Sequence, residues 1–182
     1  MPKHLMIAVD WFGSYDLGGA WEAARSDYAH ALYMCLGRQP YQRARAMQYI
    51  GIGNNVHTRL KEDHHKLQNV TRERQMWLGE IATAEPSGKK LKVTKATLDY
   101  AEWLHARFLQ LPLNEKKTKA LPPRSVTFMN RWFKTDHATP RRNRPHPNWP
   151  DLIDYPAYDL PARLVWFGRR QQYFLAPSYA RP

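Results

Sequence analysis

Two tyrosines, an arginine, a glutamate and an asparagine follow one another along this chain in an order that suits phosphodiester chemistry. They are Tyr33, Tyr49, Arg59, Glu102 and Asn114. A phenol can position water, a guanidinium can hold two phosphate oxygens at once, and one carboxylate suffices to hold Mg²⁺ or Mn²⁺ beside a phosphate. These groups together are sufficient to cut a phosphodiester bond.

The charged members of this set also have simpler interpretations. Arg59 lies within helical reach of Glu62 and Asp63, so it can form an exposed ion pair of little energetic value. Glu102 can be a surface carboxylate beside His105. The functional interpretation is favoured for both residues. Arg59 has a planar, permanently charged guanidinium that can donate two hydrogen bonds to a phosphate, and Glu102 borders an apolar run.

The tyrosines are good strand residues, and packing alone would explain them. A phenol has an ordinary pKa of about 10, so it helps to deprotonate water at neutral pH only if neighbouring cations lower that pKa. Arg59 and a metal ion are the expected sources of such lowering. Otherwise Tyr33 or Tyr49 simply orients the attacking water.

Four other titratable residues are candidates for a different, zinc-type or histidine-metal nuclease site: Glu80, His64, His65 and His105. Such a site needs clustered ligands at metal-binding spacing. The histidine pair has no cysteine partner, and Glu80 stands alone on an expected strand. The zinc interpretation is therefore the weaker one.

The elements expected to position these residues begin with two short apolar segments, 31–36 and 47–52, separated by a basic loop. Their length and aromatic content predict an antiparallel pair of strands. A helix is predicted from Asn54 or Asn55 to about Leu67, with Arg59 in its first turns.

A third strand is predicted over 75–83, followed by a turn at 86–88 and a basic segment at 89–92. Apolar residues then recur every three or four positions from Thr94 or Thr97 to about Leu109, which predicts an amphipathic helix that carries Glu102.

Prolines concentrate in the last third of the chain, where 125–133 and 163–174 are further strand candidates. Asn114 follows Pro112, so it either satisfies a turn or shapes the site.

These elements predict an α+β domain with a small, mainly antiparallel sheet flanked by helices. Residues 1–30 are expected to form a lead-in strand and helix, with the helix over 16–28, residues 31–120 the core, and residues 121–182 a proline-rich C-terminal extension packed on the same domain.

Charge and composition favour an anionic partner. The 182 residues include 28 Lys and Arg against 16 Asp and Glu, giving a formal charge of +12, and 43% of them are hydrophobic, which is enough for a core. Basic residues cluster at 38–45, 89–95, 116–119 and 141–144, where they are expected to contact backbone phosphates.

No run of eighteen apolar residues exists, so no membrane partner is expected and a cytoplasmic location is predicted. The single cysteine, Cys35, lies in an apolar run and is expected to be a buried thiol.

The order of the five site residues resembles that of the GIY-YIG nuclease superfamily, over roughly 31–114. Tyr49-Ile50-Gly51 matches the second family tripeptide, whereas Ala31-Leu32-Tyr33 keeps the tyrosine and the apolar character of the first. The resemblance implies that Arg59, Glu102 and Asn114 fill the family's arginine, metal-binding glutamate and asparagine positions.

Two positions depart from the family pattern. Asp63 stands four residues after the arginine, where a histidine or tyrosine is common, and Ile52 replaces a lysine that some members carry after the second tripeptide. His64 or His65 can take the first of these roles only if the chain there is not a regular helix.

The resemblance implies a metal-dependent DNA endonuclease. Glu102 would hold one Mg²⁺ or Mn²⁺, Arg59 would stabilise the phosphate, a tyrosine would position the water, and cleavage would leave a 3′-hydroxyl and a 5′-phosphate. Two alternatives stay open: an inactive or weakly active nucleic-acid-binding protein on the same scaffold, and a ribonuclease. The sequence leaves the oligomeric state open.

Overall fold

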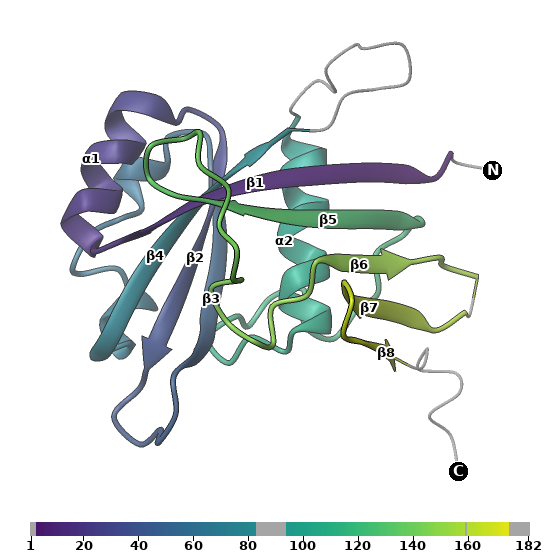
Figure 1. Ribbon diagram of the computed structural model, residues 1–182. Helices are drawn as coiled ribbons and strands as arrows, with labels where there is room; N and C mark the ends of the chain where they lie inside the picture. Colours follow the sequence, from purple (N-terminus) through teal and green to yellow (C-terminus); the bar gives the residue numbers. More distant parts are fainter. Residues whose placement is uncertain (1–2, 83–93, 159, 175–182) are drawn as a thin grey trace.

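The computed structural model describes residues 3–82, 94–158 and 160–174. Within these ranges the chain forms one eight-stranded sheet, two α-helices and two short 3-10 turns, η1 and η2 (Figure 1). In chain order the elements are β1 (Leu5–Tyr15), α1 (Leu17–Asp27), β2 (Ala31–Arg38), β3 (Ala46–Gly53), η1 (Val56–Thr58), η2 (Leu67–Asn69), β4 (Arg72–Ile81), α2 (Lys95–Phe108), β5 (Val126–Phe133), β6 (Leu152–Tyr155), β7 (Ala162–Trp166) and β8 (Arg170–Phe174).

The sheet has the strand order β3-β2-β4-β1-β5-β6-β7-β8, in which β1 and β5 run parallel and every other pair is antiparallel. The predicted small, mainly antiparallel sheet flanked by helices is therefore wrong. The sheet is large and mixed, and it curls around α2, which contacts both β3 and β6 (Figure 1). β1 was expected in a lead-in, but it lies at the centre of the sheet because Ile7, Val9 and Trp11 bury alternate side chains in the core.

The predicted C-terminal extension is also wrong. From residue 126 onward the chain supplies β5, β6, β7 and β8, which continue the same sheet. Its prolines within the described residues lie between these strands, for example Pro145, Pro147 and Pro150 in the β5–β6 connection, so they leave the backbone hydrogen bonds of the strands intact.

Each face of the sheet has its own hydrophobic core. α2 packs against one face, where Leu104, Trp11 and Trp77 belong to the larger cluster. α1 packs against the other face, together with η1 and η2, over Tyr33 and Cys35. Residues 31–37 are consequently all buried, as expected for a strand covered on both sides. Burial raises the pKa of the Cys35 thiol to about 12, in agreement with the predicted inert cysteine.

The predicted helix over 54–67 does not form. The backbone N–H groups of Thr58, Arg59 and Leu60 each bond to a carbonyl three residues earlier, which gives a 3-10 turn instead of an α-helix. Asn55 makes no side-chain cap to start a longer helix. The apolar spacing still predicts burial correctly, since Val56, Leu60 and Leu67 all enter the second core.

The remaining local predictions are largely confirmed. The helix predicted over 16–28 is α1, whose N-cap Asp16 accepts a hydrogen bond from the Gly19 amide at 2.6 Å. The second predicted helix is α2, which starts at a capping box formed by Thr94 and Thr97. The strand predicted over 163–174 is divided by a turn into β7 and β8, and β6 was not predicted. The turn at 86–88 and the basic segment at 89–92 lie outside the described residues. No helix among those described is long and apolar enough to cross a membrane.

Candidate active site

Tyr33 and Tyr49 lie on adjacent antiparallel strands with their ring centroids 5.9 Å apart. Tyr33 pairs with Gly51 across the β2–β3 ladder, and its ring lies directly over that glycine. A Cβ atom at Gly51 would fall 2.3 Å from the Tyr33 Cζ atom and 2.4 Å from its hydroxyl oxygen. The glycine of Tyr49-Ile50-Gly51 therefore makes room for the other tyrosine of the pair.

All five residues predicted for the site line one pocket of about 330 Å³. Tyr33 comes from β2, Tyr49 from β3, Arg59 from the end of η1, Glu102 from α2 and Asn114 from the segment after α2. β3 is an edge strand of the sheet. Residues from α2 on one face of the sheet and from the η1 segment on the other face can therefore meet beside β3, where they line this pocket.

A larger hollow of about 590 Å³ lies beside α1. Its lining includes Glu62 and Arg74, which bind one another through two hydrogen bonds of 2.9 Å. It has no comparable set of catalytic groups, so the smaller pocket is the candidate active site.

His64 joins the tyrosines because residues 54–67 do not form a regular helix. Its Nε2 atom lies 3.2 Å from the Tyr33 hydroxyl oxygen, and its ring centroid lies 5.6 Å from that of Tyr49. Its Nδ1 atom accepts hydrogen bonds from the backbone amides of Lys66 and Leu67. A neutral ring therefore carries its proton on Nε2 and donates it toward Tyr33.

The surroundings of His64 favour this neutral form. Burial lowers the pKa of His64, and the nearby His65 and Arg59 lower it further. The position four residues after Arg59, Asp63, departs from the family pattern, and His64 lies one residue beyond it. Helical spacing would not have selected His64, since only the irregular backbone places it here.

The two phenols are protonated at neutral pH. Burial raises the pKa of Tyr33 well above its ordinary value, and Tyr49 adds to that rise. Burial also raises the pKa of Tyr49, although a hydrogen bond from Tyr33 opposes the rise. Arg59 lowers both values and Glu102 raises both. Arg59 thus acts on both pKa values in the expected direction, but burial outweighs the guanidinium charge, which favours the alternative that a tyrosine only orients the attacking water.

Arg59 is exposed at the rim of the pocket. The predicted competing pair with Glu62 is absent, because Glu62 binds Arg74 instead. Among the residues that the structure describes, no carboxylate forms an ion pair with Arg59. Its guanidinium is thus available to an anion that enters the pocket.

Glu102 has a side chain that is 16% exposed and is paired with a lysine that the sequence did not indicate. The Lys117 Nζ atom lies 2.5 Å from Glu102 Oε2 and 2.9 Å from Asp99 Oδ1. Asp99 is one helical turn before Glu102, so the ammonium bridges both carboxylates on one side of α2. Lys117 also has a left-handed backbone, with φ of 61°, which is uncommon for a lysine and marks the position for a functional hypothesis.

Asn114 acts on the pocket through the backbone. Its Oδ1 atom accepts a hydrogen bond from the Ile50 amide, and its Nδ2 atom donates to the Ile50 carbonyl, both at 2.9 Å. The Leu113 amide bonds to the Gln48 carbonyl at 3.0 Å. The segment after α2 thereby covers the exposed edge of β3, and it leads directly into Lys117. This geometry favours the site-shaping interpretation of Asn114.

The residues of the zinc interpretation do not come together. His105 is fully buried in α2, and Glu80 lies on β4 opposite Asp10 of β1. In the described ranges, no group of three or more His, Cys, Asp and Glu side chains could hold a metal ion. A magnesium site needs fewer protein ligands, since one carboxylate, a substrate phosphate and waters can complete it. Glu102 fits that requirement if Lys117 moves away from it.

No family model, curated protein or solved structure matches this chain. The resemblance to GIY-YIG nucleases therefore rests on the identity and order of five residues. What the structure adds is geometric, because residues up to 81 positions apart, from Tyr33 to Asn114, line the same pocket.

Proposed function

We propose that this protein is a metal-dependent DNA endonuclease with a site of the GIY-YIG type, acting in the cytoplasm. One observation carries the proposal: two phenols, a guanidinium and a carboxylate, drawn from β2, β3, η1 and α2, line a single pocket of about 330 Å³. Such a set provides a positioned nucleophile, charge stabilisation and a metal ligand.

In this mechanism the phenols orient water and stay protonated. The Nε2–H group of His64 donates to the Tyr33 hydroxyl and holds that phenol beside Tyr49, whose ring centroid lies 5.9 Å from that of Tyr33. Tyr49 lines the pocket, and its hydroxyl positions the attacking water. Arg59 binds the non-bridging oxygens of the scissile phosphate, where negative charge develops in the transition state.

Glu102 would hold the metal ion, which supplies Lewis-acid polarisation of the phosphate. Asn114 keeps the wall of the pocket in place through Ile50. By similarity to the family, the products carry a 3′-hydroxyl and a 5′-phosphate.

The alternative function is nucleic-acid binding without turnover, and Lys117 is the observation that favours it. Its ammonium occupies the carboxylate that the metal requires and already neutralises its charge. In such a protein the pocket would bind phosphate through Arg59 but would not activate water.

Cleavage of supercoiled plasmid, scored for nicked and linear product with Mg²⁺, with Mn²⁺ and with EDTA, tests the proposal. We expect nicking that requires the metal and falls at least about a hundredfold in Glu102→Ala and in Arg59→Ala. Glu22→Ala and Arg25→Ala are matched controls, because both residues are exposed on α1 outside the pocket.

The outcomes separate the two functions. If Glu102→Ala retains full activity, the proposed site is wrong. If wild-type protein binds DNA without cutting it, and Arg59→Ala only weakens that binding, the alternative holds.

A further inference from the structure

The turn between β7 and β8 holds a phenylalanine in solvent. Phe167 is 55% exposed, yet its backbone is fixed on both sides. Its amide donates to Asp151 Oδ2 at 2.6 Å, and the Arg169 amide donates to the Trp166 carbonyl at 3.0 Å. Gly168 has the left-handed backbone, with φ of 71°, that this tight turn requires. A rigid turn therefore presents Phe167 to solvent.

Phe167 forms one side of a pocket of about 390 Å³. The other lining residues belong to the β5–β6 connection and to the same turn, and they are Arg142, Asn143, Arg144, Pro147 and Arg169. Asp151 joins the two sides, because it accepts hydrogen bonds from both Arg144 and the Phe167 amide. Pockets of this size hold small ligands or single building blocks of a polymer.

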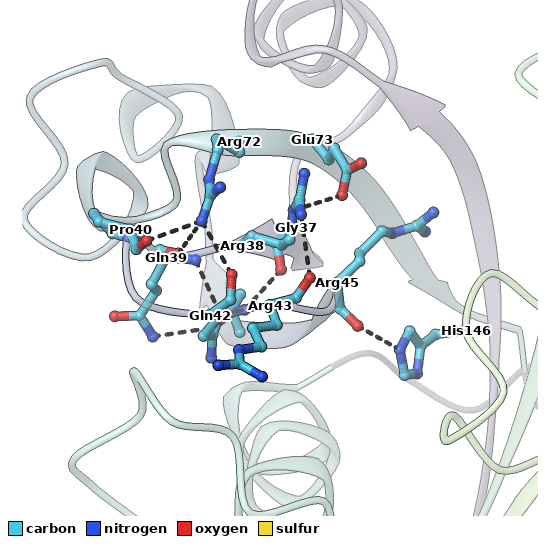
Figure 2. A network of polar contacts seen from close by, with 11 residues as sticks. Gly37, Arg38, Gln39, Pro40, Gln42, Arg43, Arg45, Arg72, Glu73 and His146 are labelled. Carbon is cyan, nitrogen blue, oxygen red and sulfur yellow. Dashed lines mark hydrogen bonds and ion pairs between the residues drawn. The ribbon is translucent and has the colours of Figure 1, made fainter.

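The β5–β6 connection is itself fixed to the β2–β3 loop, a hundred residues away in sequence (Figure 2). Arg45 Nη2 donates to the Pro145 carbonyl at 2.9 Å, and His146 Nε2 lies 3.0 Å from the Arg45 carbonyl oxygen. Arg72 in turn holds the β2–β3 loop through three backbone carbonyls. The pocket is thus preorganised on both sides, which reduces the entropic cost of binding.

The charges in the pocket are not balanced. Asp151 pairs with Arg144, but Arg142 and Arg169 are exposed and form no ion pair with any described carboxylate. An exposed phenylalanine alone is ordinary on a protein surface. A phenyl ring carried by a fixed turn, in one pocket with two available guanidinium groups, is more specific, because it suits a ligand that combines a flat ring with an anion.

We propose that this pocket binds one unpaired nucleotide of a nucleic-acid strand. The base stacks on Phe167, and Arg142 and Arg169 bind the adjacent phosphates. A base inside a duplex is stacked on both sides and cannot offer its face to Phe167, so the subsite selects strands with a single-stranded segment. The subsite contains no residue of the candidate active site, and its existence does not depend on cleavage.

Fluorescence anisotropy in EDTA tests the proposal without cleavage. The probes are a labelled oligo-dT of about 20 nucleotides and a labelled duplex of the same length. We expect Phe167→Ala to weaken binding of oligo-dT by about tenfold and to leave duplex binding within about twofold, since one stacked base contributes a factor of roughly 5 to 150. Phe167→Leu, which keeps the apolar contact but not the stacking, should show most of the same loss.

Tyr173→Ala is the matched control, because Tyr173 is 56% exposed on the adjoining strand β8 and does not line the pocket. It should leave binding of both probes unchanged. Arg142→Gln and Arg169→Gln should each weaken binding of oligo-dT and reduce its dependence on salt. Each variant should unfold at the same temperature as wild type, which shows that its overall fold is intact.

Unchanged binding of oligo-dT by folded Phe167→Ala, or an equal loss of both probes, would overturn the proposal. If the wild-type protein does not cut plasmid but Phe167→Ala still weakens oligo-dT binding, the subsite is supported and the proposed activity is rejected. The reverse result, metal-dependent cutting with Phe167→Ala indistinguishable from wild type on both probes, rejects the subsite alone.

Discussion

At the scale of single residues, Gly51 determines where the Tyr33 hydroxyl can lie. Replacing it with alanine would place a methyl carbon 2.3 Å from the Tyr33 ring, and both residues sit in paired strands that cannot separate cheaply. We predict that Gly51→Ala lowers the free energy of unfolding by about 1–3 kcal/mol and abolishes cleavage, because the ring must leave the pocket. Urea denaturation and the plasmid assay measure the two effects.

Gly53→Ala is the control, since a Cβ atom at Gly53 would meet its nearest neighbour, Val56, at 3.5 Å. This variant should unfold and cut like wild type. If Gly51→Ala cuts plasmid as well as wild type, cleavage does not depend on the observed position of the Tyr33 ring.

Lys117 provides a second test at this scale. Its ammonium competes with a metal ion for Glu102, so Lys117→Met should bind Mn²⁺ about tenfold more tightly than wild type. Isothermal titration calorimetry gives the affinity directly, and Glu102→Ala should abolish the same binding.

Lys116→Met removes the same charge from an exposed residue that lines the same pocket and forms no ion pair with a described residue. Its effect should be much smaller because solvent screens an exposed charge. An equal increase in Mn²⁺ affinity in both variants would show that the affinity depends only on net charge and not on the ion pair between Lys117 and Glu102.

The sequence predicted some of these residues and not others, for a physical reason. Tyr33, Tyr49, Arg59, Glu102 and Asn114 were predicted because residue type and order along the chain carry the information. The contact of Lys117 with Glu102 depends on how the chain turns after α2, including a left-handed backbone at Lys117 itself. No periodic pattern encodes such a turn.

At the scale of elements, α2 contains a buried histidine that links its packing to pH. His105 is fully buried and lies 2.7 Å from the Ala101 carbonyl oxygen and 3.1 Å from Asn130 Oδ1. Burial lowers the pKa of His105 to about 4, although both hydrogen bonds oppose this. Its folded pKa is therefore below the unfolded value of about 6.5.

Stability should fall on acidification, because the unfolded chain takes up a proton at His105 that the folded protein excludes. The contribution is complete above pH 6.5, declines as the pH falls and is lost by about pH 4. The full difference is about 3 kcal/mol. Urea unfolding at pH 7 and pH 4.5 should show a larger loss in wild type than in His105→Gln, and equal losses would contradict the assignment.

Elements were predictable where local rules decide them. The helices α1 and α2 and the apolar strands β2 and β3 have clear local signals in composition and apolar spacing, and they form as predicted. The segment 54–67 buries the predicted apolar side chains but folds as turns, because contacts with the second core replace helical hydrogen bonds. His64 reaches the tyrosines only for that reason.

At the scale of the molecule, the sheet order could not be predicted from local pattern. β1 pairs in parallel with β5, more than a hundred residues later, and this pairing joins the half that carries the candidate active site to the C-terminal strands. Because the sheet curls, Met47 of β3 and Trp166 of β7 line a common pocket although their strands are far apart in the sheet order. The C-terminal strands thus support the region around β3 and also carry the Phe167 turn.

The formal charge of +12 makes a prediction for the whole molecule. Lys and Arg that contact phosphates displace condensed counterions, so the association constant should fall steeply with salt. For Glu102→Ala and a duplex of about 20 base pairs in EDTA, we expect a loss of about a thousandfold between about 50 and 200 mM NaCl, which corresponds to roughly six phosphate contacts. On this duplex Arg142→Gln should leave the slope of log K against log salt nearly unchanged, because the Phe167 subsite takes an unpaired nucleotide, whereas the slope for oligo-dT should fall. An affinity independent of salt would show that the excess positive charge serves something other than nucleic acid.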